Sequence, residues 1–262
     1  MAAKKAVAEA TSKNIVEFNP VPAMFAEDAG MGVTSLGHED LSTPFLRLVQ
    51  MNNQAKALGA NIGDFFNTVT QEVWKGTEGI SVINCGYNLV HLEWAPKEGE
   101  GKKPPVNRYT ALDKLPETVR GPEGKEMLNS GSGNYLEKTA EHFVLILDED
   151  DFAQQALICM KSTALKISKS WNSTMRSMKM KDDTNGNIFI PPRFSYIWKI
   201  TTVSESNAKG EWVQWQIAKD RVIDNADLYG QAKSFAELIM AGEVKVQHVQ
   251  DDKEDFDADI PF

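Results

Sequence analysis

The feature that most constrains the fold is one amphipathic helix placed among runs of β-forming residues. Ser162 and Thr163 can cap a helix that runs to about Met180. The polar stretch at residues 182–186 contains Asn-Gly and ends it. Several strand-like runs precede this helix, and two more follow it, so the helix divides a largely β chain into two parts.

The runs before the helix predict strands. Residues 45–50 alternate in polarity, which places Leu46 and Leu48 on one face and Arg47 on the other. Residues 63–70 and 80–94 are also β-rich. The apolar runs at residues 143–147 and 156–160 flank an acidic turn, which predicts a hairpin.

The runs after the helix predict a strand pair and a terminal helix. Residues 194–201 and 212–217 flank a turn at residues 207–210. A helix follows over residues 222–241, with an apolar face that contains Leu228, Ala232, Phe235, Leu238 and Ile239. An oligonucleotide-binding (OB) barrel carries its helix between the third and fourth strands. We therefore expect a mainly β protein with two helices (α+β), built as an OB-fold-like barrel with long loops and a disordered acidic C-terminal tail.

The remaining segments are predicted to be loops or terminal extensions. Residues 96–108 are rich in Gly, Pro and Lys, and residues 112–133 are loop-rich with a short helix near residues 125–128. Small and apolar residues at 21–32 predict a further short helix. We expect three parts: a flexible N-terminal arm (1–40), an OB-like body that includes the C-terminal helix (41–241) and an acidic tail (242–262).

Composition narrows the class of protein. The net charge of the 262-residue chain is −9, but residues 251–262 alone carry −5. The body is therefore only mildly acidic, which excludes a histone-like binder and still allows a local cationic surface. The apolar runs at Cys85 and Cys159 predict buried, reduced thiols, and no spacing of Cys and His predicts zinc. Neither a membrane span nor a signal peptide is predicted, so we expect a cytoplasmic protein without a cofactor or metal.

The predicted helix carries a cationic stretch without acids. Residues 161–181 contain no Asp or Glu. Leu165, Trp171, Met175 and Met178 fall near one face, and Ser173 and Ser177 lie among the basic residues of another. Cations with small hydroxyl donors are typical of phosphate binding, although a solvated helix face is the ordinary alternative. The predicted phosphate-binding residues are Lys161, Lys166, Lys169, Arg176, Lys179 and Lys181, joined by Arg193 and Lys199.

Aromatic residues alternate with basic ones elsewhere in the chain. The pairs are Trp74 with Lys75 and Arg108 with Tyr109, and residues 193–199 repeat the pattern. Bases of single strands stack on exposed rings while cations follow the backbone. Alternation puts Phe194, Tyr196 and Trp198 on one face, so Tyr196, Trp198 and Trp74 are predicted stacking residues. Packing in the core is the alternative for each ring, and the lysines at 97, 102 and 103 read as solvated.

The C-terminus has a distinct composition. Acids at Asp255, Asp257 and Asp259 precede an apolar end, which consists of Ile260, Pro261 and Phe262. An apolar anchor, a terminal carboxylate and steering acids are what a docking peptide needs. This tip closely resembles that of bacterial single-stranded DNA-binding proteins. The resemblance implies that these six residues dock replication and recombination proteins.

A second resemblance involves the body. Residues 160–172, 191–196 and 201–215 look like those of bacteriophage proteins often found among replication and recombination functions. Phage single-stranded DNA-binding proteins are similar in plan, with a barrel-like body and an acidic tail. These resemblances imply a phage-type protein that coats single-stranded DNA during replication, recombination and repair. The large body and short linker differ from the bacterial proteins, so a homo-oligomer is allowed but their tetramer is not implied.

Two other functions remain open from the sequence. A single-strand annealing or recombination accessory protein would have a similar composition. A metal nuclease would use Asp148 and its acidic neighbours to 151 together with Asp182 and Asp183. Carboxylates after a strand are also ordinary turn residues, and the chain contains neither a phosphate-binding loop motif nor a catalytic spacing of histidines. No catalytic residue is predicted.

Overall fold

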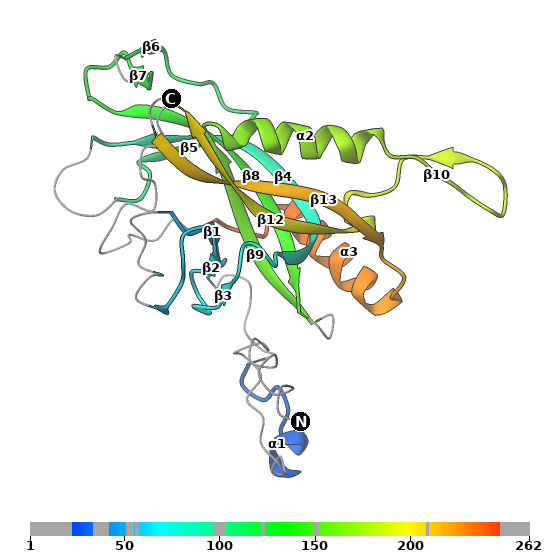
Figure 1. Ribbon diagram of the computed structural model, residues 1–262. Helices are drawn as coiled ribbons and strands as arrows, with labels where there is room; N and C mark the ends of the chain where they lie inside the picture. The colour runs from blue at the N-terminus through cyan, green and yellow to red at the C-terminus, as the bar shows by residue number, and fades with distance from the viewer. Residues whose placement is uncertain are drawn as a thin grey trace.

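The computed structural model describes residues 23–33, 42–50, 55, 58–96, 103–121, 124–148, 152–207 and 210–246. The chain is mainly β with two long helices, as the sequence predicts (Figure 1). In order, the elements are α1 (Ala23–Glu27), β1 (Leu46–Leu48), β2 (Phe65–Asn67), β3 (Val73–Trp74), β4 (Ile80–Trp94), β5 (Asn107–Tyr109), β6 (Thr118–Arg120), β7 (Glu126–Leu128), β8 (Tyr135–Leu147), β9 (Ala153–Lys161), α2 (Ala164–Ser177), β10 (Met180–Lys181), β11 (Ile188–Phe189), a 3-10 turn (Arg193–Ser195), β12 (Tyr196–Asn207), β13 (Gly210–Val222) and α3 (Ala226–Ala241).

One antiparallel sheet forms the body of the molecule. Its central strands follow the order β9-β8-β4-β12-β13, and β5, β6 and β7 extend it. The sheet curls so that β12 and β13 cross in front of β8 and β9 (Figure 1). Both predicted hairpins are confirmed, because β8 pairs with β9 and β12 pairs with β13.

The two ends of the curled sheet do not pair with each other in the described part of the chain. Strand β1 and the start of α2 fill the seam instead. Phe45 forms a parallel bridge with Leu157 of β9, and the Gln50 side chain both donates to and accepts from the main chain of Val213 on β13. At the other end of the seam, Gln214 Nε2 donates to Thr163 Oγ1 at 2.7 Å. The half-barrel is therefore closed by segments from outside the sheet.

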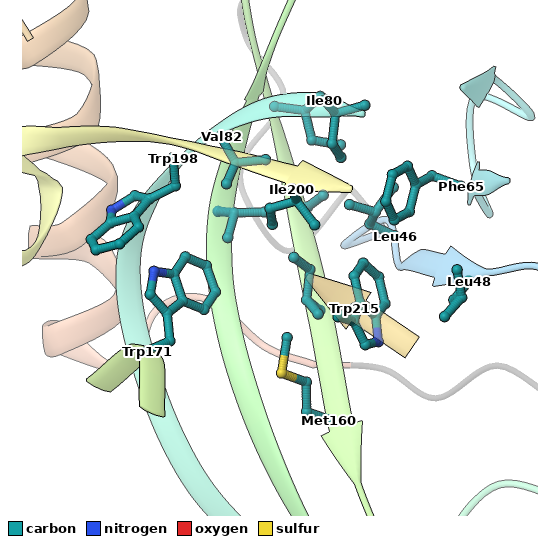
Figure 2. Packing of buried hydrophobic residues seen from close by; sticks show 14 of the residues in the cluster. Leu46, Leu48, Phe65, Ile80, Val82, Met160, Trp171, Trp198, Ile200 and Trp215 are labelled. Atoms are coloured by element: carbon teal, nitrogen blue, oxygen red, sulfur yellow. The ribbon is translucent and has the colours of Figure 1, made fainter. Parts of the chain in front are cut away.

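The inner face of the sheet holds the largest apolar cluster. Side chains of β1 and β2 meet those of β4, β9, β12 and β13, and Trp171 of α2 packs among them (Figure 2). Phe65 stacks on Trp215 with ring centroids 5.3 Å apart, and Trp171 meets Trp198 edge-on at 5.8 Å. The inner core thus fixes α2 and the small β1-β2-β3 sheet to the same surface.

The outer face of the sheet is covered by α3. Its buried residues, Leu228, Ala232, Phe235 and Ala236, pack on residues of β4, β8, β9 and β12. Gly86 lies at a β-bulge in β4, where an added Cβ atom would come within 2.8 Å of the Ile239 side chain, so a larger residue here would force that side chain of α3 to shift. Val244 and Val246, in the segment predicted as tail, also pack on this cluster.

The structure corrects several local predictions. Residues 126–128 form strand β7 paired with β6, not a helix, because cross-strand pairing decides the conformation of such a short run. Phe194 lies in the 3-10 turn and packs on the outer cluster with Tyr229, so it does not share a face with Tyr196. The short helix near residues 21–32 is confirmed as α1. Within the described residues, no helix is both long and apolar enough to cross a membrane.

Candidate nucleic-acid interface

Helix α2 is amphipathic, as its sequence predicts. Ala164, Ser168, Trp171 and Met175 are buried, at the i, i+4, i+7 and i+11 positions of one face. Thr163 occupies the predicted N-cap position, but its side chain forms no capping hydrogen bond. The Thr163 hydroxyl instead accepts from Gln214, and Ser162 adopts a φ of 49° at the sharp turn out of β9. Tertiary packing therefore positions this helix.

The opposite face of α2 is cationic and exposed. Lys166, Lys169 and Arg176 are exposed, and none of them forms an ion pair with a described residue. Two hydroxyl groups on this face bond to carbonyls of the helix itself. Thr174 donates to the Ser170 carbonyl and Ser177 to the Thr174 carbonyl. The surface therefore consists of cations that lack a counter-charge within the described residues.

A buried polar cluster attaches the underside of α2 to the sheet. His142 of β8 is fully buried between Asn84 of β4 and Ser168 of α2. Arg193 Nη1 donates to Asn84 Oδ1 at 3.3 Å, which turns the Asn84 amide nitrogen toward His142 Nδ1 at 3.0 Å. Nδ1 is then the acceptor, and Nε2 donates to Ser168 Oγ at 2.8 Å. The geometry requires a neutral imidazole.

The pKa of His142 is consistent with a neutral imidazole. Burial, together with the positive charge of Arg193, lowers the pKa of His142 from 6.5 to about 3. The imidazole also stacks on Trp171 with a centroid distance of 4.7 Å. His142 therefore acts as a neutral packing and hydrogen-bonding residue beneath the cationic helix.

Arg193 has a structural role in this arrangement. Its guanidinium also donates to Asn172 Oδ1 of α2 at 2.9 Å and lies over the Tyr87 ring at 5.5 Å. Burial lowers the pKa of Arg193. The side chain ties α2 to β4, so it is already engaged where the sequence predicted a phosphate contact.

The cationic surface continues beyond the end of α2. Lys179 and Lys181 are exposed in the hairpin formed by β10 and β11, directly after the helix. Lys161 lies at the other end, where it is partly buried and forms an ion pair with Glu137 at 3.3 Å. Of the six predicted cations in this stretch, the structure thus brings five together as an exposed set: Lys166, Lys169, Arg176, Lys179 and Lys181.

The aromatic rings predicted to stack on bases are less exposed than the α2 lysines and Arg176. Trp198 is only 2% exposed and packs against Trp171, so its ring cannot receive a base and this prediction is wrong. Tyr196 is half-buried, with the Lys219 ammonium 5.2 Å above its ring. Trp74 is half-buried against the inner core. Lys199, also half-buried, donates to the Gly79 carbonyl at 3.2 Å.

The basic and aromatic pair at Arg108 and Tyr109 also has a structural role. Arg108 forms an ion pair with the buried carboxylate of Glu141 at 2.6 Å on the outer face. The Tyr109 hydroxyl donates to Glu93 at 2.8 Å. These contacts join β5 to β4 and β8, so the pattern of alternating basic and aromatic residues here reflects packing.

Two carboxylates of the nuclease alternative, Asp148 and Asp182, accept hydrogen bonds from turn amides. Asp148 Oδ1 accepts from the Phe152 amide at 2.9 Å, and Asp182 Oδ1 accepts from the Thr184 amide at 2.8 Å. No group of three metal-binding side chains occurs among the described residues, and residues 149–151 lie outside them. The six predicted docking residues of the tail likewise lie outside the described residues.

Sequence reasoning missed several residues of this region. Gln214 and Asn84 are buried amides that no local pattern distinguishes, because their partners come from distant strands. Phe189 is 44% exposed beside the lysines of the hairpin. Its signal was visible as three consecutive large apolar residues between an Asn-Gly turn and two prolines.

Comparison with protein families identifies the family of this chain. A family model described as Pam3 phage gp34-like protein matches residues 11–245. The chain belongs to this phage protein family. The match spans the whole sheet and both long helices, and it includes the cationic stretch of α2. No curated protein and no solved structure matched the chain.

Proposed function

We propose that this phage-family protein binds single-stranded DNA without sequence preference, with the exposed face of α2 as its main phosphate-binding surface. The observation that carries the proposal is the set of five exposed cations on α2 and the following hairpin, none paired with a described residue. We call this set the α2 cations: Lys166, Lys169, Arg176, Lys179 and Lys181.

A solvated helix face does not explain this distribution well. The chain carries a net charge of −9, yet residues 161–181 contain no acid to neutralise the cations. Like charges one turn apart on a helix repel one another, which weakens the folded state slightly. A polyanion supplies the missing counter-charge and releases its own condensed ions on binding.

The architecture supports the same function. Counted as five strands, β4, β8, β9, β12 and β13 have the pairing order of an OB barrel, with α2 between the third and the fourth. In that fold the loops between strands one and two and between strands four and five border oligonucleotide sites. Here these loops are the β4–β8 and β12–β13 connections. We infer an OB-like barrel whose seam is closed by β1.

The usual sheet surface of such a barrel is partly occupied in this chain. Helix α3 packs on the outer face of β4, β8 and β9, and Arg108 and Lys161 are paired there with Glu141 and Glu137. The α2 cations are therefore the better candidates for phosphate contacts. Tyr196 and Trp74, each half-buried, remain candidate stacking rings at the rim of the inner core.

The tail completes the proposal. Its terminal Ile260, Pro261 and Phe262 would dock replication, recombination or repair proteins in the cytoplasm of the infected host, and its acids would compete with DNA for the α2 cations. Truncation after Gln250 should then tighten DNA binding. Equal affinity of the truncated and full chains would contradict this part of the proposal.

Fluorescence anisotropy of a labelled oligothymidine is the direct test. A label on the DNA is preferable to tryptophan fluorescence because Trp94, Trp171, Trp198 and Trp215 are buried and the other two tryptophans are half-buried. The test variant is the triple substitution K166A/K169A/R176A. Each phosphate contact contributes about 0.7 to the slope of log affinity against log salt. The variant should therefore lose about 2 units of slope and about 100-fold in affinity at 0.1 M salt.

The matched control is Lys233→Ala on α3. Lys233 is also an exposed helical lysine, but it is paired with Glu237 at 3.9 Å. This control should bind as the unmodified chain does. Absence of binding by the unmodified chain, or equal binding by the triple variant, would reject the proposal. Faster pairing of complementary strands on addition of protein would instead favour the annealing function.

A further inference from the structure

A short β-hairpin follows α2 and is not part of either the inner or the outer apolar core. Met180 pairs with Phe189 and Lys181 with Ile188. The Asp182 amide donates to the Asn187 carbonyl at 2.8 Å, and the Gly186 amide donates to the Asp182 carbonyl at 2.7 Å. The hairpin projects from the body beyond the end of α2 (Figure 1). We call it the α2 hairpin.

The α2 hairpin exposes three consecutive large apolar side chains. Ile188 is 68%, Phe189 44% and Ile190 61% exposed. None of them belongs to a core cluster of the described residues. An isolated two-stranded hairpin is only marginally stable in water, and an exposed apolar strip marks a binding surface. The strip is therefore a candidate binding surface.

The neighbours of this strip indicate what the ligand is. Lys181 lies directly across from Ile188, so these two side chains share one side of the hairpin. Phe189 lies with Met180 on the other side. Protein interfaces are depleted in lysine, whereas single-strand binding surfaces combine cations with rings that stack on bases. The charge of the surrounding surface is thus complementary to a nucleic acid strand.

We propose that the α2 hairpin is a base-contacting arm of the interface, in which Phe189 stacks on a base of single-stranded DNA. Lys181, on the other side of the two-stranded hairpin, and Lys179, which directly precedes Met180, hold phosphates of the same DNA strand as it passes around the hairpin, and they continue the path set by Lys166, Lys169 and Arg176. The arm supplies the exposed ring that Trp198 cannot supply. This inference rests on the proposed function, since it assigns the base contact of the same interface.

The test compares Phe189→Ala with two oligomers of equal length, one an oligothymidine and the other an abasic strand with the same phosphates. Loss of a stacking ring corresponds to roughly 5- to 150-fold in affinity. Phe189→Ala should lose that factor on oligothymidine and bind the abasic strand as before. Phe189→Trp should retain binding, which shows that the ring and not the fold of the hairpin is responsible.

Phe152→Ala is the matched control. Phe152 is 66% exposed at the β8–β9 turn, where it is held by Asp148 and lies away from the α2 cations. This variant should bind both strands normally. A photoreactive oligonucleotide with iodouracil bases should crosslink to the tryptic peptide of residues 182–193, which contains Phe189.

These measurements distinguish a failure of the base-contacting arm from a failure of the proposed DNA-binding function. If the unmodified chain binds neither strand, the proposed function fails and the arm with it. If the unmodified chain binds and Phe189→Ala binds oligothymidine equally well, only the arm is rejected. Unchanged affinity together with a smaller assembly in light scattering would also reject it, because the strip would then join copies of the chain.

Discussion

Helices α2 and α3 pack on opposite faces of one sheet, but of the two only α3 has a side-chain N-cap and an ion pair between described residues of the helix. Asn225 caps α3 by accepting from two backbone amides, Gly242 ends it at a φ of 74°, and Lys233 pairs with Glu237. By contrast, α2 has no side-chain cap, rests on a polar cluster and carries cations without described partners. The difference indicates that α3 is a structural element and that α2 retains features that stability alone does not favour.

The largest expected effect is a loss of stability when the buried aromatic anchor of either helix is removed. Trp171 of α2 and Phe235 of α3 are each almost fully buried. Replacing either with alanine leaves a cavity in one of the two cores and should lower the free energy of unfolding by about 3–5 kcal/mol. Urea denaturation followed by circular dichroism measures this. A much smaller loss for Trp171→Ala would mean that α2 is not anchored as its contacts indicate.

A smaller effect on stability, which depends on pH, is expected for the buried polar cluster under α2 and not for the apolar contacts of α3. Since burial holds the pKa of His142 at about 3, the unfolded chain takes up a proton below pH 6.5 while the folded chain does not. Stability from this group is complete above pH 6.5 and is lost as the pH falls toward 3. Between pH 6.5 and 5 the loss should be about 2 kcal/mol.

His142→Gln provides the comparison for that prediction. Glutamine can still form hydrogen bonds but does not titrate, so its urea midpoint should depend less on pH over the same interval. Carboxylates and other histidines titrate in both proteins and cancel in the difference. Parallel pH profiles for the two proteins would show that the imidazole becomes protonated without disturbing the contact with α2.

The smallest expected effect concerns surface charge. Lys233→Ala removes an exposed pair in the weaker orientation, with lysine N-terminal to glutamate, and should cost at most about 0.5 kcal/mol. Lys169→Ala on α2 removes a cation that has no described ion-pair partner, and it should leave stability unchanged or slightly higher. Chemical denaturation of both variants in low salt tests this. A clear loss for Lys169→Ala would assign its charge a structural role.

The sequence predicts the periodic elements well and the individual contacts poorly. Strand β4 follows from a long run of β-forming residues, and the buried face of α2 follows from hydrophobic periodicity. The short strand β7 does not, since its partner determines it. Trp198 and Arg193 show the same limit for the site. Alternation gives the face on which a residue lies, but which face becomes the core depends on the curl of the sheet and on α2.

The seam of the half-barrel also bears on how the chain folds. Gln50 meets Val213 across 163 residues of sequence, and Thr43 meets the carbonyl of Lys245 across 202. A strand near the beginning of the chain must therefore wait for nearly the whole polypeptide before it can dock. Contacts this distant slow folding, because the entropy of closing the loop is lost before the contacts form. On the ribosome, β1 would be synthesised among the first elements and would be among the last to reach its place.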